Sequence, residues 1–247
     1  MAADCPQCAG TGFALSARED GVVTAVRCDC ERDAASDRRL RQAHLPRRYD
    51  HCRLDNFDRQ NDTLTEALRR AERWVELWPA QDQGLLLHGP PGTGKTHLAV
   101  AVGRALIERK QARVLFQEQR ELLRLLQGTF DSGAAQREAE ILAPVLDAEL
   151  LILDDLGAGR TTPWARDVMH DVIVHRYNEQ KHVILTSNLQ MGEEPDAAAA
   201  PRALDAPLSL RDRLGDALMS RLYEMCLVVE LSGRDYRTGA RRFKDRY

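Results

Sequence analysis

The segment after the apolar run Leu85–Leu87 constrains the fold more than any other feature of the sequence. It has the pattern Gly-x-x-x-x-Gly-Lys-Thr, and its members are Gly89, Pro90, Pro91, Gly92, Thr93, Gly94, Lys95 and Thr96. Residues with the apolar spacing of a helix follow it. Because a strand, a glycine-rich loop and a helix in this order form a phosphate-binding loop (P-loop), we expect an α/β nucleotide-binding fold.

The residue types in this loop suit the phosphates of ATP. Its glycines let consecutive backbone N–H groups face one centre, and the helix N-terminus adds a partial positive charge. We expect Lys95 to neutralise the β- and γ-phosphates and Thr96 Oγ1 to ligate Mg²⁺. The alternative is an ordinary Gly/Pro turn, but a chance match to the whole pattern is rare.

An apolar run that ends in two acids predicts the second half of the site. Leu150–Leu153 is followed by Asp154 and Asp155. At the carboxyl edge of a parallel sheet, these carboxylates would lie beside the P-loop. We expect Asp154 to hold Mg²⁺ through its water shell and Asp155 to orient or deprotonate an attacking water. Two exposed acids at a strand end are the alternative interpretation.

Apolar runs alternate with helical patterns from residue 63 onward, which predicts a five-stranded parallel sheet with helices on both faces. Thr63 and Glu66 have the spacing of a capping box, and Thr162 with Pro163 predicts another helix start. Residues 192–209 are rich in Ala and Pro and predict a mobile loop, followed by one helix over 210–223. The predicted strands are 84–88, 113–117, 149–154, 182–186 and 226–231, and the remaining predicted helices include 95–110, 118–127, 134–147 and 162–180.

Four of the six cysteines lie near the start of the chain, as Cys5, Cys8, Cys28 and Cys30. In a reducing compartment such a cluster favours metal binding over disulfides. Four thiolates in two pairs suit a structural Zn²⁺ site, with an iron–sulfur cluster or free cysteines as alternatives. A hairpin between the pairs and a charged helix from Cys30 to about Ala43 complete a small module. Cys52 and Cys226 stand alone, and we expect both to be inert.

These patterns divide the chain into a zinc-binding module with a basic helix, residues 1–45, and an ATPase domain, residues 46–247. The start of the chain lacks the features of a secretory signal, and no run of about 18 apolar residues occurs, so we expect a cytoplasmic protein. The net charge of −3 identifies no partner. Residues 234–247 form a basic tail, which is either a solvated end or a contact to a phosphate backbone.

With these residues in place, the chain resembles the AAA+ ATPases, and within them the DnaC/IstB-type family of helicase loaders and transposition helpers. Gly89–Thr96 resembles the Walker A motif of that family, and Leu150–Gly157 resembles its Walker B motif. Asn188 matches the sensor-1 position, and Arg221 matches the arginine finger. Gly233–Arg237 resembles the closing motif, with Asp235 in place of its serine.

The resemblance implies that ATP binds between subunits, with Arg221 reaching into the site of a neighbour and Asn188 acting within its own chain. It also implies that residues 118–147 face single-stranded DNA, although their leucines suit an ordinary core equally well. The amino-terminal module would dock on a replicative helicase, or it is a structural cap on the ATPase domain.

Two departures from the family pattern bear on the activity. The acid pair is Asp154-Asp155 where many AAA+ proteins have Asp-Glu, so we expect slow hydrolysis. Few residues follow the last predicted strand, so we expect no helical lid, and Arg237 is a candidate substitute for the arginine of that lid. Both departures favour an ATP-dependent switch over a fast motor.

The leading hypothesis is therefore a helicase-loader ATPase that acts on a replicative helicase and single-stranded DNA. The second hypothesis is a transposition helper whose partner is a transposase. Two further hypotheses are a P-loop kinase of small molecules and a non-enzymatic zinc adaptor with a vestigial ATP fold. We expect ATP, Mg²⁺ and a structural Zn²⁺ ion as ligands.

Overall fold

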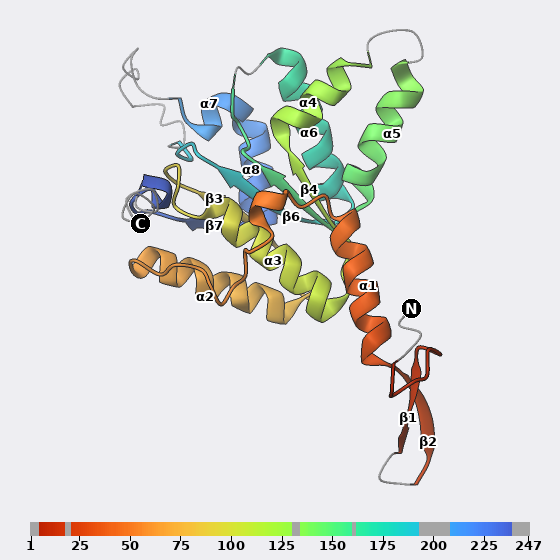
Figure 1. Ribbon diagram of the computed structural model, residues 1–247. Coiled ribbons are helices and arrows are strands. Elements are labelled where there is room, and N and C mark those ends of the chain that lie inside the picture. The colour runs from red at the N-terminus through yellow and green to blue at the C-terminus, as the bar shows by residue number, and fades with distance from the viewer. Residues whose placement is uncertain (1–4, 18–20, 130–133, 160–161, 193–207, 239–247) are drawn as a thin grey trace, which may run out of the picture.

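A five-stranded parallel sheet organises the protein, as the computed structural model shows (Figure 1). The structure describes residues 5–17, 21–129, 134–159, 162–192 and 208–238. The strand order is β4-β5-β6-β3-β7, and every pair is parallel. The strands are β3 (Gly84–His88), β4 (Val114–Glu118), β5 (Leu150–Asp154), β6 (His182–Ser187) and β7 (Cys226–Glu230). The predicted fold class is confirmed.

The central residues of the strands are apolar, as expected where both faces of a sheet are covered. Leu85 and Leu87 pack into one core with helices α2 (Asp62–Leu77) and α3 (Lys95–Lys110). Leu86 of the same strand points into the other core. This second core contains residues of α4 (Gln119–Gln127), α5 (Ala134–Asp147), α6 (Pro163–Asn178), α7 (Leu210–Leu214) and α8 (Asp216–Met225). In Figure 1, α2 and α3 lie on one side of the sheet and the later helices on the other.

Two helix predictions were wrong in detail. The cap of α2 is Asn61, whose side chain accepts a hydrogen bond from Leu64 N at 2.9 Å, so Thr63 lies inside the helix and forms no capping box. The predicted helix over 210–223 is two helices, because Gly215 has φ 85° between α7 and α8. A capping box of Ser209 and Asp212 starts the first of them.

The predicted loop over 192–209 falls mostly outside the described residues, as does the tail beyond residue 238. Among the described residues after β7, residues 231–235 are not helical and residues 236–238 are helical, so the expected absence of a helical lid stays a prediction. Within the described part of the chain, no helix is both long and apolar enough to cross a membrane.

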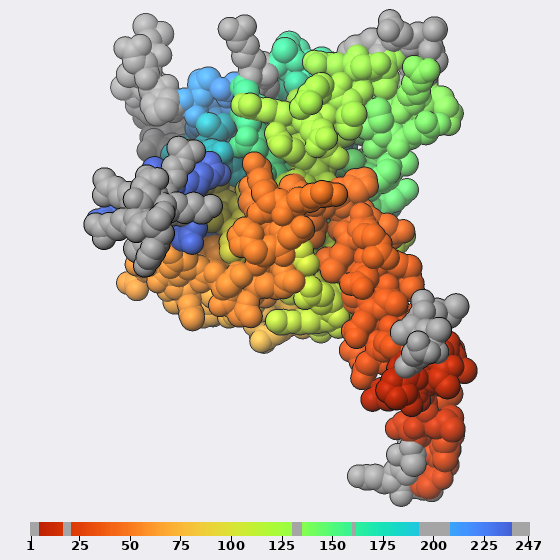
Figure 2. All heavy atoms as spheres, in the orientation of Figure 1, coloured from red at the N-terminus to blue at the C-terminus, as the bar shows by residue number. Residues whose placement is uncertain are grey.

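The amino-terminal part forms an antiparallel hairpin and a helix. The hairpin pairs β1 (Phe13–Ala17) with β2 (Val23–Arg27), and α1 (Asp29–Gln42) follows. Figure 2 shows the hairpin projecting from the body of the protein. By contrast, α1 packs on α3 and β4, and Phe116 N donates to Ala43 O at 2.8 Å beyond its last turn. A helix that contacts the core, followed by the short 3₁₀ helix η1 (Arg47–Tyr49), therefore connects the hairpin to the sheet.

Candidate functional site

The P-loop lies between the end of β3 and the start of α3, at the carboxyl edge of the sheet. Gly94 caps α3 with φ 95°, a left-handed conformation that favours glycine. A Cβ atom at Gly94 would lie 2.9 Å from Cε2 of Phe57, so the ring packs directly on the loop. The backbone conformation and the ring together require glycine at this position.

Lys95 is only 5% exposed and folds back onto its own loop. Its Nζ donates to Gly89 O at 2.8 Å and to Pro90 O at 2.7 Å. Burial lowers the pKa of Lys95 to about 8, with Asp154 and Asp155 acting in the opposite direction. The ammonium group is therefore held at the loop, where a bound phosphate would become its stronger partner.

The buried carboxylate of Asp154 joins the P-loop helix to the sheet. Its Oδ1 accepts hydrogen bonds from Thr96 Oγ1 at 2.8 Å and from Thr186 Oγ1 at 2.6 Å. Burial raises the pKa of Asp154, and these two hydroxyl donors partly offset that effect. Oxygen ligands from a hydroxyl and a carboxylate suit Mg²⁺, so Thr96 and Asp154 would hold this ion beside the phosphates.

Asp155 and Asn188 also meet at this edge. Asn188 Nδ2 donates to Asp155 Oδ1 at 2.7 Å, and Asp155 N donates to Thr186 Oγ1 at 2.9 Å. Thr186 therefore contacts both acids, since its hydroxyl accepts from the backbone of one and donates to the side chain of the other. Sequence reasoning gave Thr186 no role of its own. The sequence feature that could have indicated a role for Thr186 is its position at the end of the strand next to the acidic strand.

A cavity of about 860 Å³ contains these groups. The segment before the core contributes Arg48, Tyr49 and Phe57 to its walls, and the segment after β7 contributes Arg234 and Arg237. The P-loop residues Gly92, Thr93, Gly94, Lys95 and Thr96 line it together with Asp154, Asp155, Thr186 and Asn188.

The residues after β7 pack on the P-loop. Tyr236 N donates to Gly92 O at 3.1 Å, and Asp235 Oδ1 accepts from Arg237 N at 2.8 Å. A Cβ atom at Gly92 would collide with the Asp235 carboxylate, which fixes how closely the two segments approach. This contact places Arg237 in the wall of the cavity formed by its own chain.

Arg221 is the one predicted catalytic residue that this chain does not bring to the cavity. It lies on α8, and its Nη1 donates to Ala217 O of the same helix at 3.0 Å. Because α8 ends where β7 begins, Arg221 lies toward the amino edge of the sheet, opposite the P-loop. Within one chain it cannot contact the nucleotide cavity.

The four amino-terminal cysteines converge on one point. The Sγ atoms of Cys5 and Cys28 are 3.7 Å apart, those of Cys8 and Cys30 are 3.4 Å apart, and all four lie within 4.8 Å of one another. A tetrahedral Zn²⁺ site with Zn–S bonds of about 2.3 Å places its sulfurs about 3.8 Å apart. Donor set and spacing therefore fit a closed structural zinc site.

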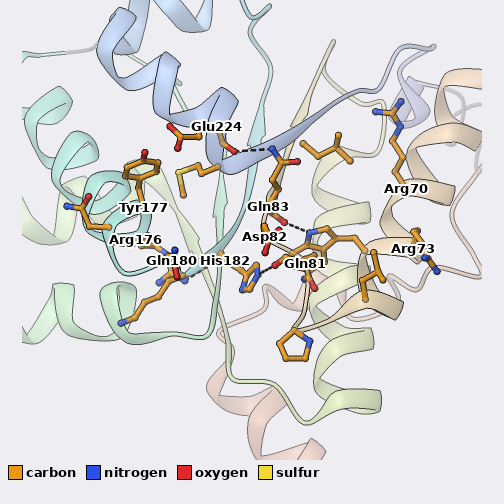
Figure 3. Close-up of a pocket in the computed structure, with 18 of the residues that line it drawn as sticks. Arg70, Arg73, Gln81, Asp82, Gln83, Arg176, Tyr177, Gln180, His182 and Glu224 are labelled. Carbon is orange, nitrogen blue, oxygen red and sulfur yellow. Dashed lines mark hydrogen bonds between the residues drawn. The ribbon is translucent and has the colours of Figure 1, made fainter.

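A second cavity, of about 1370 Å³, lies at the amino ends of β3, β6 and β7 (Figure 3). Polar groups in its wall bond one another: Trp74 Nε1 donates to Gln83 O at 2.6 Å, and Gln83 Nε2 donates to Glu224 O at 3.0 Å. The fully buried Arg176 donates to His182 O at 2.7 Å. None of the site residues predicted from the sequence lines this cavity. The candidate site is therefore at the carboxyl edge.

Comparison with known proteins agrees with this geometry. The family described as IstB-like ATP binding protein matches residues 25–243. A putative insertion sequence ATP-binding protein of Sinorhizobium fredii is 33% identical over 178 residues, which are 68% of this chain and 56% of that protein. The replicative helicase loader DnaC of Buchnera aphidicola is 26% identical over 57% of each chain. DnaC of Escherichia coli is 23% identical over 81% of this chain and 79% of that one. The alignment thus spans little more than half of the first two relatives.

Solved structures give the same fold. The crystal structure of the DnaC helicase loader matches with a TM-score of 0.63 and 32% identity, covering 76% of this chain and 100% of that one. A putative primosome component from Streptococcus pyogenes has a TM-score of 0.61 at 23% identity, over 81% and 96% of the two chains. These matches confirm the resemblance that the sequence motifs indicated.

Proposed function

Because the chain belongs to the family of IstB-like ATP binding proteins, we propose that it is an ATPase of the helicase-loader type that uses bound ATP as a switch. The observation that carries this proposal is a continuous series of hydrogen bonds from Thr96 through Asp154, Thr186 and Asp155 to Asn188. It links the P-loop helix to the ends of β5 and β6. A change at the γ-phosphate would therefore alter the contacts of both strands.

In this proposal the residues of the cavity have separate roles in phosphoryl transfer. The loop and Lys95 bind the phosphates, while Thr96 and Asp154 hold Mg²⁺, which would neutralise charge on the phosphate oxygens. Asp155 orients or deprotonates the attacking water, and Asn188 contacts the water or the γ-phosphate. To make this contact, Asn188 would have to give up the hydrogen bond that it donates to Asp155. Arg237 lines the cavity and is the candidate for a further contact to the γ-phosphate within the same chain.

We assign Arg221 to the site of a neighbouring subunit. Two features support this assignment: its position toward the amino edge of the sheet, and its absence from the walls of the cavity in its own chain. A head-to-tail neighbour would present this edge to the P-loop of the next subunit. There a guanidinium group would stabilise charge on the transferred phosphoryl group.

The proposed partners are a replicative helicase and single-stranded DNA. The DnaC relatives and the DnaC helicase-loader structure support the helicase, while single-stranded DNA rests on the resemblance of the sequence motifs alone. A transposition helper with a transposase as its partner is the second candidate. The relative in Sinorhizobium fredii, which is 33% identical, favours it. The comparisons give no support to a small-molecule kinase, and a measured ATP turnover would exclude a vestigial adaptor.

A binding experiment separates the two candidates. The full chain, immobilised with ATP and Mg²⁺, is offered the replicative helicase of its host and, separately, a transposase encoded beside its gene. We expect ATP-dependent capture of the helicase and none by Lys95→Ala, which lacks the phosphate-binding ammonium. Capture of the transposase alone would establish the second candidate instead, and capture of neither would refute the proposed switch.

A further inference from the structure

A second group of metal-binding side chains lies in the wall of the nucleotide cavity. His51 and Cys52 come from the segment before α2, and His97 comes from the first turn of α3. One potential ligand atom from each lies within 4.8 Å of the other two. His51 Nε2 is 4.0 Å from Cys52 Sγ, and all three residues line the cavity. A ligand distance of this size is close to the roughly 3.6 Å between N and S in a tetrahedral zinc site.

The hydrogen bonds of His97 leave one ring nitrogen for a ligand. Its Nε2 lies 3.3 Å from Arg53 O and 3.1 Å from Asn56 Oδ1. The orientation of Asn56 is fixed, because its Nδ2 donates to His51 O at 2.7 Å while its Oδ1 accepts from Arg53 N at 2.9 Å. Both neighbours of Nε2 are thus acceptors, so Nε2 carries the proton and Nδ1 keeps its lone pair. A backbone carbonyl that accepts from the second ring nitrogen is the usual support of a metal-binding histidine.

The donor set points to a particular class of metal. Zn²⁺ prefers sulfur and nitrogen ligands such as this thiol and these two imidazoles, whereas Mg²⁺ requires oxygen donors. Cys52 is fully buried and His51 is exposed, so the group extends from the core to the cavity surface. The cavity leaves room for water as a fourth ligand.

We propose that His51, Cys52 and His97 bind one Zn²⁺ ion, separate from the ion of the four-cysteine module. Cys52 binds as a thiolate, and its proton passes to solvent when the metal enters. The ion would fasten the segment of residues 51–57 to α3. Phe57 belongs to that segment and packs against both His97 and Gly94, so the ion would fix one wall of the nucleotide cavity.

Metal content of the purified full chain tests this site. The protein is saturated with Zn²⁺, freed of unbound metal by gel filtration and analysed for zinc by atomic spectroscopy. We expect His51→Gln and Cys52→Ala each to hold one equivalent less than the unmodified chain. His44→Asn and Cys226→Ala are the matched controls, because neither residue is near the group, and both should keep the full content. The comparison is a difference, so it does not depend on what the four-cysteine module binds.

Cobalt provides the spectroscopic signature. With Co²⁺ in place of Zn²⁺, the spectrum of the unmodified chain minus that of Cys52→Ala should contain a thiolate-to-cobalt charge-transfer band. Circular dichroism checks that the variants are folded, and the exposed His51→Gln provides a second variant if Cys52→Ala unfolds. Equal zinc content in His51→Gln and the unmodified chain, or a difference spectrum without the band, would overturn the proposal.

Discussion

Thr186 is the residue through which the two acids of the site are connected. Its hydroxyl donates to Asp154 at 2.6 Å and accepts from the backbone of Asp155 at 2.9 Å. It is buried, so no water replaces either bond when the hydroxyl is lost. The acid proposed to bind Mg²⁺ and the acid proposed to orient water therefore depend on one side chain in the neighbouring strand.

Thr186→Val tests this connection with little change in side-chain volume. We expect ATP affinity to change by less than about threefold, because the P-loop is untouched, while the hydrolysis rate falls by about tenfold or more. The loss of a buried hydroxyl partner should also lower the free energy of unfolding by about 1–3 kcal/mol. Thr186→Ser, which keeps the hydroxyl, is the control and should retain most of the rate. A valine variant with an unchanged rate would remove Thr186 from the mechanism.

The lowered pKa of Lys95 predicts how ATP binding depends on pH. Burial lowers this pKa to about 8 in the free protein, and bound phosphates would raise it, so the complex would hold more protons than the free chain. ATP affinity should consequently be constant below pH 8 and fall above it, by at most about tenfold per pH unit. Calorimetry near pH 8.5 in buffers of different ionisation enthalpy should detect proton uptake on binding. Proton release, or no exchange, would contradict this assignment.

At the scale of elements, most of the fold could be predicted because apolar runs and helical periodicity are both local properties of a sequence. Continuous apolar runs marked the strands, and β3 and α3 have the predicted bounds. The helix predicted over 210–223 was wrong because helical periodicity persists across Gly215, whereas its positive φ breaks the backbone. The capping-box pattern at Thr63 misled in a similar way, since Asn61 two residues earlier supplies the cap.

The residues of the candidate site also fall into two groups: those that local motifs reveal and those that only tertiary packing brings to the cavity. Lys95, Thr96, Asp154, Asp155 and Asn188, which the structure brings together in one cavity, could be predicted to meet because each follows a strand or opens a helix in a recognisable motif. Apart from Arg237, the groups from the flanking segments were harder to find, since residues 48–57 and 234–237 reach the cavity only through tertiary packing. His51 and Cys52 belong to this second class, and isolated Cys52 was predicted to be inert.

The hairpin and its cysteines are the element least supported by an apolar core. Phe13, Leu15 and Val23 of the hairpin are 55%, 79% and 58% exposed, so a metal ion would have to supply much of its stability. We expect replacement of Cys5 and Cys8 by serine to release one equivalent of Zn²⁺ and to leave ATP affinity unchanged. Zinc analysis and a nucleotide-binding titration measure the two effects.

The predicted division near residue 45 is tested by the same variant. If the ATPase core unfolds together with the hairpin, the two parts form one cooperative unit. The packing of α1 on α3 and β4 provides a physical route for such coupling. A core that keeps its thermal transition after the zinc is released would support the division.

At the scale of the whole molecule, the proposed site is incomplete in a single chain. The P-loop, the acids and Asn188 lie at the carboxyl edge of the sheet, while Arg221 lies toward the amino edge. In a head-to-tail assembly, the amino edge of one chain, with Arg221, would face the carboxyl edge of the next chain, with the P-loop. The rate of ATP hydrolysis per chain should therefore rise with protein concentration. A variant that lacks Arg221 and a variant that lacks Lys95 should complement each other when they are mixed.

The most direct test measures ATP hydrolysis in a mixture of two inactive variants. Lys95→Ala should bind no ATP but still present Arg221, and Arg221→Ala should bind ATP but present no arginine. We expect each alone to hydrolyse ATP at least about tenfold more slowly than the unmodified chain, and their mixture to regain a clear part of the activity. Arg73→Ala, an exposed arginine on α2, is the control and should behave as the unmodified chain. A fully active Arg221→Ala variant, or a mixture no faster than its parts, would contradict a site shared between subunits.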